Sequence, residues 1–315
     1  MRHNGFRQII FQREVLLAIF IVVFGLIASF ATPYFFQFAN FQQVFIAIAL
    51  DMIVAVGMTI VLVSGGIDLS VGSVIGLCAA ILGLAFGVGM SIPLVVMLAI
   101  AGGIVIGVIN GVLIAWVKIN PIITTLGTMT IARSGCYILT AGYPLSSIPP
   151  KFKAFSAGNF LGIPNNAVVA LLCVIVADLA LRNNVSLRKF FFLGGNEAAA
   201  FRAGIRVTWY KLLAYVISAV AAALAGILLV ARLGSAFPHS GLGTELRVIS
   251  ACIIGGCSIS GGRGTVIGSF LGVLLLGLIS NVLVLSNVSV YWQGVITGII
   301  LILAVASDAI LNKEK

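Results

Sequence analysis

Residues 62–77 read LVSGGIDLSVGSVIGL and place two adjacent glycines and the carboxylate of Asp68 between two long apolar runs. A carboxylate is expensive in hydrocarbon, and a glycine pair permits a tight turn. The stretch therefore predicts a turn between two membrane helices, followed by a closely packed second helix. Asp68 either caps the helix that begins near Ser70 or is a polar element of a gate.

The composition of the whole chain agrees with a membrane setting. Its 315 residues are 61% hydrophobic and 8% charged, and the mean hydropathy is +1.22. A soluble domain carries roughly 25% charged residues. Only helices and closed barrels span lipid, and the apolar runs here are continuous rather than alternating. The sequence therefore predicts an all-α, polytopic integral membrane protein.

Ten apolar windows indicate about ten transmembrane helices in a single domain over residues 1–315. The first window follows a basic stretch but is too long for a signal peptide, so we expect it to be a retained helix. The windows are 15–32, 41–64, 71–89, 92–117, 121–141, 166–181, 209–231, 245–260, 265–285 and 290–308.

Lysine and arginine predict the orientation, because cytoplasmic loops hold the excess of both. With the N-terminus inside, the outer segments hold Lys151, Lys153, Arg232 and Arg247. The inner segments hold Arg2, Arg7, Arg13, Lys118, Arg182, Arg188, Lys189, Arg202, Arg206, Lys211, Arg263, Lys313 and Lys315. We therefore expect both termini in the cytoplasm. The net charge of +10 is a topology signal, and no nucleic-acid partner is expected.

The long inner loop at 182–211 contains LGGNEAAAFRAGI, which predicts a short helix of its own. Asn196 is a good N-cap, Glu197 lies at the positive helix end, and Gly204 ends the helix. A simple connection needs only a few residues, so this loop favours a docking surface. The alternative is an ordinary basic loop attracted to anionic lipid.

Sequence motifs of catalysis are absent. No G-x-x-x-x-G-K-[ST] or H-E-x-x-H occurs, and the two histidines, His3 and His239, lie outside the apolar windows. The five cysteines form no C-x-x-C pair. We therefore expect no enzyme activity, no metal and no cofactor in this chain.

Glycines recur every four residues in two windows, which puts them on one helix face where backbones approach closely. They are Gly103, Gly107 and Gly111, and Gly264, Gly268 and Gly272. In addition, Ser64–Gly76 partly repeats as Ser260–Gly272, with serine and glycine at matching offsets. Both copies begin on the predicted cytoplasmic side. Internal duplication and recurrent packing geometry both remain open.

A few polar residues within the windows are candidates for the solute pathway, since ionisable and polar groups in a membrane are costly. Asp51 has two interpretations: a pathway or inter-helix role, or local structural pairing with Arg133 as the partner. The pathway candidates are Asp51, Asn110, Thr124, Thr128 and Asn281.

Four stretches together resemble the ribose-type sugar permeases, the membrane subunits of bacterial ABC importers for small sugars and autoinducer-2. The most specific is AVGMTIVLVSGGIDLSVGSVIGL at Ala55–Leu77. The others are INGVLIAWVKINPIITTLGTM at Ile109–Met129, LGGNEAAAFRAGI at Leu193–Ile205 and IIGGCSISGGRGTVIGSFLGVLLLGLISN at Ile253–Asn281. Asp51 departs from the family pattern, in which a neutral or small residue is more usual.

The resemblance implies an alternating-access permease in the bacterial inner membrane. Its partners would be a second permease copy or a related permease, a cytoplasmic sugar-type ABC ATPase that holds ATP and Mg²⁺, and a periplasmic sugar-binding protein. By position, the ATPase-coupling segment is 186–207, with Gly194, Gly195, Asn196, Glu197, Ala198 and Gly204 at the contact. The family signature or gate is Gly65, Gly66, Asp68, Ser70 and Gly72.

Other classes remain open on the sequence. They are an ABC permease for branched-chain amino acids or nucleosides, an ion- or proton-coupled secondary transporter, and a channel or facilitator. A proton relay would need several titratable groups in a chain, and this sequence has few within its apolar windows.

Overall fold

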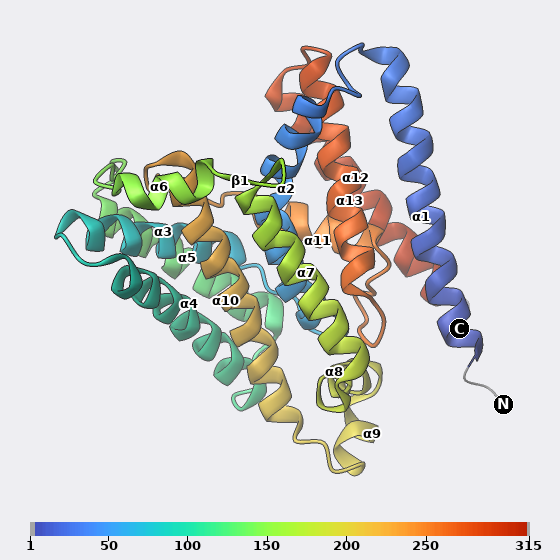
Figure 1. Ribbon diagram of the computed structural model, residues 1–315. Coiled ribbons are helices and arrows are strands. Elements are labelled where there is room, and N and C mark those ends of the chain that lie inside the picture. The colour runs from blue at the N-terminus through green and yellow to red at the C-terminus, as the bar shows by residue number, and fades with distance from the viewer. Residues whose placement is uncertain (1–3, 314–315) are drawn as a thin grey trace.

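The computed structural model describes residues 4–313, so Arg2, His3 and Lys315 lie outside the described residues (Figure 1). The elements are almost all helices. They are α1 (Asn4–Ala31), α2 (Phe38–Val63), α3 (Val71–Gly87), α4 (Ile92–Ala115), α5 (Pro121–Thr140), α6 (Pro150–Ala157), β1 (Asn159–Phe160), β2 (Ile163–Pro164), α7 (Asn165–Asn183), α8 (Val185–Gly195), α9 (Glu197–Arg202), α10 (Val207–Leu233), α11 (Thr244–Ile254), α12 (Val266–Leu285) and α13 (Val290–Lys313).

Seven helices in the described part of the chain are long and apolar enough to cross a membrane: α1, α2, α4, α5, α7, α10 and α12. The chain is therefore a multi-pass membrane protein. α3 has 17 residues, and α11 has only 11, well short of the roughly 20 that a full crossing needs. The sequence prediction of a complete span at 245–260 is therefore wrong.

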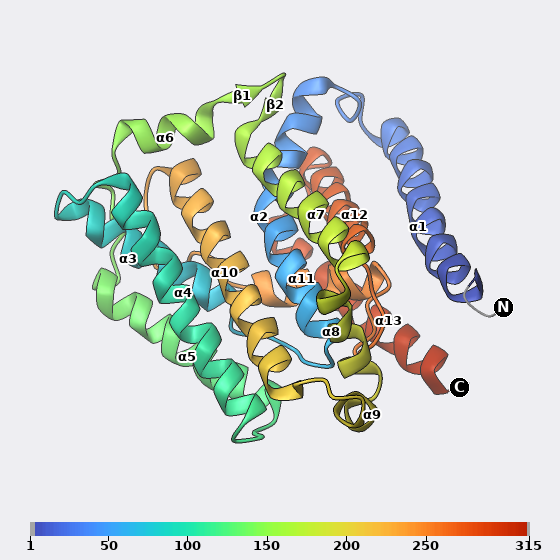
Figure 2. The same ribbon diagram turned by 60° about the horizontal axis from the view of Figure 1, so that its bottom comes forward.

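α2 and α10 form the centre of the bundle. In their apolar windows 83% and 67% of the residues are buried, against 11% for α1. Figure 2 shows α3, α4 and α5 on one side of this pair and α1, α12 and α13 on the other. Helices that are apolar all round must be buried or face lipid, so α2 and α10 form the core and the outer helices supply the lipid-facing surface.

The two ends of the bundle carry different short elements. α6 and the hairpin β1–β2 lie at one end, and α8 and α9 lie at the other (Figure 1). Gln42 Nε2, near the start of α2, donates to the carbonyl oxygen of Gly162 at 2.6 Å, which ties α2 to the hairpin end. We call these the hairpin end and the α8 end.

The chain between α10 and α12 crosses the bundle without a full helix. Near the hairpin end Ala236 pairs with Leu145 in an isolated β-bridge. Near the α8 end the Gly262 amide donates to the carbonyl oxygen of Val63 at 2.9 Å. Gly241 and Gly243 have φ of +75° and +77°, so the segment before α11 turns where a helix cannot continue. α11 is thus a half-helix inside the bundle.

Candidate functional site

The α8 end carries the short capped helix that the sequence predicts. Asn196 Oδ1 accepts a hydrogen bond from the Ala199 amide at 2.9 Å, so Asn196 is the N-cap of α9. Gly204 follows α9 with φ of +79°, which favours glycine. Glu197 Oε2 lies 2.7 Å from Lys211 Nζ, so an ion pair joins α9 to α10. α9 is therefore held in place by its own cap and by a contact to a core helix.

Three glycine pairs that are far apart in the sequence meet beside α9. A methyl group on Gly194 would lie 2.0 Å from the carbonyl oxygen of Val63 and 2.7 Å from the amide nitrogen of Gly262. A methyl group on Gly261 would lie 2.9 Å from the Cα atoms of both Gly194 and Gly65. Backbone therefore touches backbone here, with no space for a side chain.

We call this contact the glycine junction: residues 63–66 at the end of α2 and in the turn after it, Gly194–Gly195 at the end of α8, and Gly261–Gly262 before α12. The double glycines of Ser64–Gly76 and of its partial repeat both belong to it, and Gly65, Gly261 and Gly262 have positive φ. Local sequence patterns indicate each glycine pair separately. Their convergence is a long-range contact that no local pattern contains.

The glycines of the two ladders lie at helix contacts. Methyl groups on Gly103, Gly107 and Gly111 would approach α10, and those on Gly268 and Gly272 would approach the backbone of residues 251–255 at about 2 Å. Gly264 lies beside Cys257, and Gly72 lies beside Glu245 and the carbonyl oxygen of Gly241. Each set therefore lets two backbones approach closely.

Asp68 lies in a buried polar network. Its Oδ1 accepts from the Ser70 amide at 3.0 Å and from Ser70 Oγ at 2.6 Å, and its Oδ2 accepts from Ser218 Oγ at 2.8 Å. Asn110 Nδ2 donates to Ser70 Oγ at 3.0 Å, and Thr128 Oγ1 donates to Asn110 Oδ1 at 2.6 Å. The network joins the start of α3 to α4, α5 and α10.

This placement separates the pathway candidates into two groups. Asn110 and Thr128 have their hydrogen bonds within the Asp68 network, and Thr124 Oγ1 donates to the carbonyl oxygen of Asn120 at 3.1 Å. Asp51 and Asn281 instead line a cavity on the other side of α2. The structure therefore does not bring the five candidates to one place.

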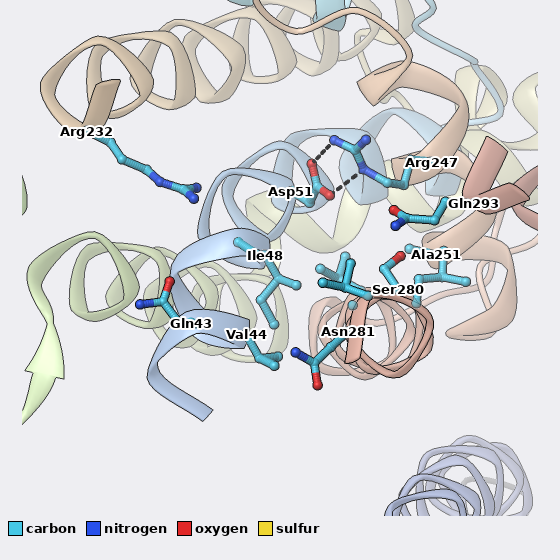
Figure 3. A pocket seen from close by; sticks show the side chains of 15 residues that line it. Gln43, Val44, Ile48, Asp51, Arg232, Arg247, Ala251, Ser280, Asn281 and Gln293 are labelled. Carbon is cyan, nitrogen blue, oxygen red and sulfur yellow. Dashed lines mark hydrogen bonds and ion pairs between the residues drawn. The ribbon is translucent and has the colours of Figure 1, made fainter. Parts of the chain in front are cut away.

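The cavity has a volume of about 420 Å³ and lies between α2, α10, α11, α12 and α13 (Figure 3). Its polar lining residues are Gln43, Asp51, Arg232, Arg247, Ser280, Asn281 and Gln293. Asn281 exchanges two hydrogen bonds with Asn40, at 2.8 and 3.0 Å, which occupy its amide. Ligand pockets have volumes of roughly 300–1,000 Å³, so this cavity is large enough for a small solute.

Asp51 is paired with Arg247, not with Arg133. Arg247 Nε lies 2.6 Å from Asp51 Oδ2, and Arg247 Nη2 lies 2.9 Å from Asp51 Oδ1. Arg133 instead donates to the carbonyl oxygens of Pro238, Ser240 and Gly72. The pairing with Arg133 weighed from the sequence is therefore wrong.

Arg247, which the sequence groups with the outer segments, is a lining residue of the cavity. It is in the first turn of α11 and faces Asp51 near the middle of α2. Sequence reasoning missed its site role, although one signal was available: Asp51 and Arg247 are an acid and a base within apolar windows, and such groups neutralise each other when they are buried. Among the described residues no group of His, Cys, Asp or Glu could hold a metal ion.

Residues 40–305 match the family described as the branched-chain amino acid transport system permease component. The chain belongs to this family. The matched range includes the residues of the glycine junction and those that line the cavity. A permease of this family is a transport component rather than an enzyme.

Curated relatives of this permease cover nearly its whole length. It is 38% identical to the ribose import permease protein of Bacillus subtilis over 93% of this chain and 91% of the relative. It is 35% identical to the ribose import permease protein of Haemophilus influenzae over 98% of this chain and 96% of the relative. It is 34% identical to the autoinducer 2 import system permease protein of Photorhabdus luminescens over 96% of this chain and 91% of the relative. No solved structure matches the permease significantly.

Proposed function

We propose that this chain is the membrane permease of an ATP-driven importer for a monosaccharide or a related small sugar, working by alternating access. Relatives named as ribose and autoinducer-2 import permeases support the sugar class. The glycine junction would transmit movement of the ATPase to the membrane helices. It connects the end of α8, next to α9, to the turns before α3 and α12 through direct backbone contact.

A contact of this kind suits the transmission of force. Where no side chain separates two backbones, a displacement of one segment moves the other at once, since packed backbones have almost no compressible space between them. Closure of an ATPase against α8 and α9 would shift Gly194, and with it the turns at residues 63–66 and 261–262. α3, α12 and the half-helix α11 adjoin these turns and would move against the core.

The orientation proposed is that the α8 end faces the cytoplasm. α8, α9 and the adjoining ends of α7 and α10 carry Arg182, Arg188, Lys189, Arg202, Arg206 and Lys211, the excess that cytoplasmic segments hold. The first described turn of α1 and the last of α13 lie toward the same end (Figure 1). We propose an inner-membrane protein with both termini cytoplasmic and about ten passes, in which α3 and the residues 234–254 are the incomplete ones.

The partners proposed are a cytoplasmic ABC ATPase that holds ATP and Mg²⁺, a periplasmic sugar-binding protein at the hairpin end, and a second permease, identical or related. The ATPase contact comprises Gly195, Asn196, Glu197, Ala198 and Gly204 around the exposed Phe201, while Gly194 faces inward. The outer helices α1, α4 and α5 meet lipid or the second permease.

Isolation of the tagged permease from native membranes tests this assembly. We expect a stoichiometric ATPase subunit to co-purify, and ATP hydrolysis to disappear when that subunit is removed from the preparation. Isolation of the permease without any nucleotide-binding subunit, at detergent concentrations that keep other ABC importers intact, would contradict the proposal.

Reversal of the charge at Glu197 tests whether α9 contacts the ATPase. Glu197→Arg should weaken ATPase association at least about tenfold, because it reverses a charge on the proposed docking surface while leaving the cap at Asn196 in place. The matched variant Glu197→Arg/Lys211→Glu restores an ion pair between α9 and α10 with reversed polarity. Full recovery of association in the double variant would mean that Glu197 acts only within the permease, which would remove it from the interface.

A further inference from the structure

We infer that the cavity between α2 and α11 binds the vicinal hydroxyl groups of the permeating sugar through the Asp51–Arg247 ion pair. The inference rests on the proposed function, since it names the contact that a sugar permease would make with its solute. The observations that carry it are the position of the cavity, the geometry of the ion pair and the charge balance of its lining.

The cavity extends inward from the hairpin end. Gln43 lies near the start of α2, Arg232 near the end of α10, and Val284 near the end of α12. Asp51 and Ala251 line it at the depth of the middle of α2 and of the half-helix α11. A solute delivered at the hairpin end would therefore reach the ion pair near the middle of the bundle.

The ion pair presents both kinds of hydrogen-bonding group to the cavity. Arg247 uses Nε and Nη2 on Asp51, which leaves the N–H groups of Nη1 as donors. Each carboxylate oxygen of Asp51 has lone pairs beyond the one that faces Arg247. The Arg247 side chain is 42% exposed, and its guanidinium borders the cavity (Figure 3). Two neighbouring hydroxyls could donate to the carboxylate and accept from the guanidinium at once.

The formal charges in the cavity lining indicate which class of solute the cavity fits. Asp51 and Arg247 neutralise each other, so neither is left to bind the carboxylate or the ammonium group of an amino acid. Arg232 is the remaining formal charge in the lining, and it is exposed and donates to the carbonyl oxygen of Ile46 at 3.0 Å. Apolar residues such as Ile48, Ala251 and Leu276 line the cavity beside the neutralised ion pair, so this part of the cavity carries no net charge. These properties fit an uncharged polyol rather than a zwitterion or an anion.

α11 connects this contact to the coupling segment. Arg247 lies at its first turn, and residues 251–255 at its other end touch the backbone of α12 at Gly268 and Gly272. The residues that follow α11 enter the glycine junction at Gly261 and Gly262. Movement of the junction would therefore displace Arg247 from Asp51 and release a solute held by the pair.

The test compares ribose with 2-deoxyribose, which lacks one hydroxyl of a vicinal pair. Uptake is measured in proteoliposomes that hold the permease, its ATPase and saturating binding protein, so that delivery is equal for both sugars. We expect the wild type to favour ribose by roughly 10–100-fold, because a hydrogen bond to a charged group is lost with the hydroxyl. In Asp51→Asn this preference should fall to within about threefold.

A structural role of the ion pair predicts a different result, since it would lower uptake of both sugars equally and leave their ratio unchanged. That unchanged ratio would overturn the inference. Ser280→Leu, which adds bulk to the cavity lining, should reduce ribose uptake at least about tenfold, whereas Thr130→Ala on α5, an exposed residue outside the lining, should stay within about twofold. Ribose uptake by Ser280→Leu at the wild-type rate would also overturn the inference.

Three further outcomes complete the test. Stronger competition by the corresponding sugar acid than by ribose would replace the neutral polyol with an anionic solute and overturn the charge argument. ATPase co-isolation with Asp51→Asn shows that the variant is folded and assembled. Absence of ATP-driven uptake by the wild type would instead contradict the proposed function, so the two failures are distinguishable.

Discussion

Gly194→Ala should abolish ATP-driven uptake. The added methyl group would lie 2.0 Å from the carbonyl oxygen of Val63 and 2.7 Å from the amide nitrogen of Gly262. Both neighbours are backbone atoms, so no side chain can rotate to make room, and the glycine junction has to open. Opening also breaks the hydrogen bond between Gly262 and Val63. We expect a loss of more than about 100-fold in uptake rate, since about 3 kcal/mol of strain or lost contact suffices.

Gly127→Ala is the matched control. It makes the same chemical change on α5, outside the glycine junction and the ATPase contact, where a methyl group would meet no atom within 4 Å. Replacing glycine by alanine in a helix is neutral or stabilising by up to roughly 1 kcal/mol when the site is open. Uptake by Gly127→Ala should therefore match the wild type. Equal uptake by the two variants would show that the junction does not transmit the ATPase movement.

A second large effect is expected from Asp68→Ala. The substitution leaves the Ser70 amide and the hydroxyls of Ser70 and Ser218 without their buried acceptor, and each unpaired buried donor costs about 1–3 kcal/mol. The midpoint of thermal unfolding in detergent should therefore fall by about 5 °C or more. Ser218→Ala removes one of these donors and should cause a smaller decrease.

Thr130→Ala is a suitable control for Asp68→Ala, because it removes an exposed side-chain bond to the carbonyl oxygen of Leu126. Its unfolding midpoint should stay within about 1 °C of the wild type. An Asp68→Ala variant with unchanged stability but no uptake would instead favour the gate interpretation of Asp68 over the structural one.

Local features were predictable from the sequence. The N-cap at Asn196 involves an amide only three residues later, and the turn at Gly204 depends on the backbone conformation of one residue. Both features can therefore be predicted from a few neighbouring residues in the sequence. The membrane class follows from composition alone. All ten apolar windows contain helix, because an apolar run in lipid has to satisfy its backbone groups internally.

Long-range contacts were not predictable in this way. The meeting of Gly65, Gly194 and Gly261 depends on how two turns pack against the end of α8. The choice of Arg247 over Arg133 as the partner of Asp51 depends on the position of α11. Hydropathy cannot distinguish a half-helix buried in protein from a membrane span, since both are apolar. Asn110 and Asp51 both read as intramembrane polar residues, yet one closes a packed network and the other faces a cavity.

Uptake by reconstituted vesicles tests the central claim most directly. The permease is placed in proteoliposomes with and without its co-purified ATPase, and labelled ribose uptake is followed with loaded binding protein, with ATP or with a non-hydrolysable analogue. We predict uptake only when the ATPase, hydrolysable ATP and binding protein are all present. Uptake by the permease alone, unaffected by ATP or driven by a sodium or proton gradient, would contradict the account.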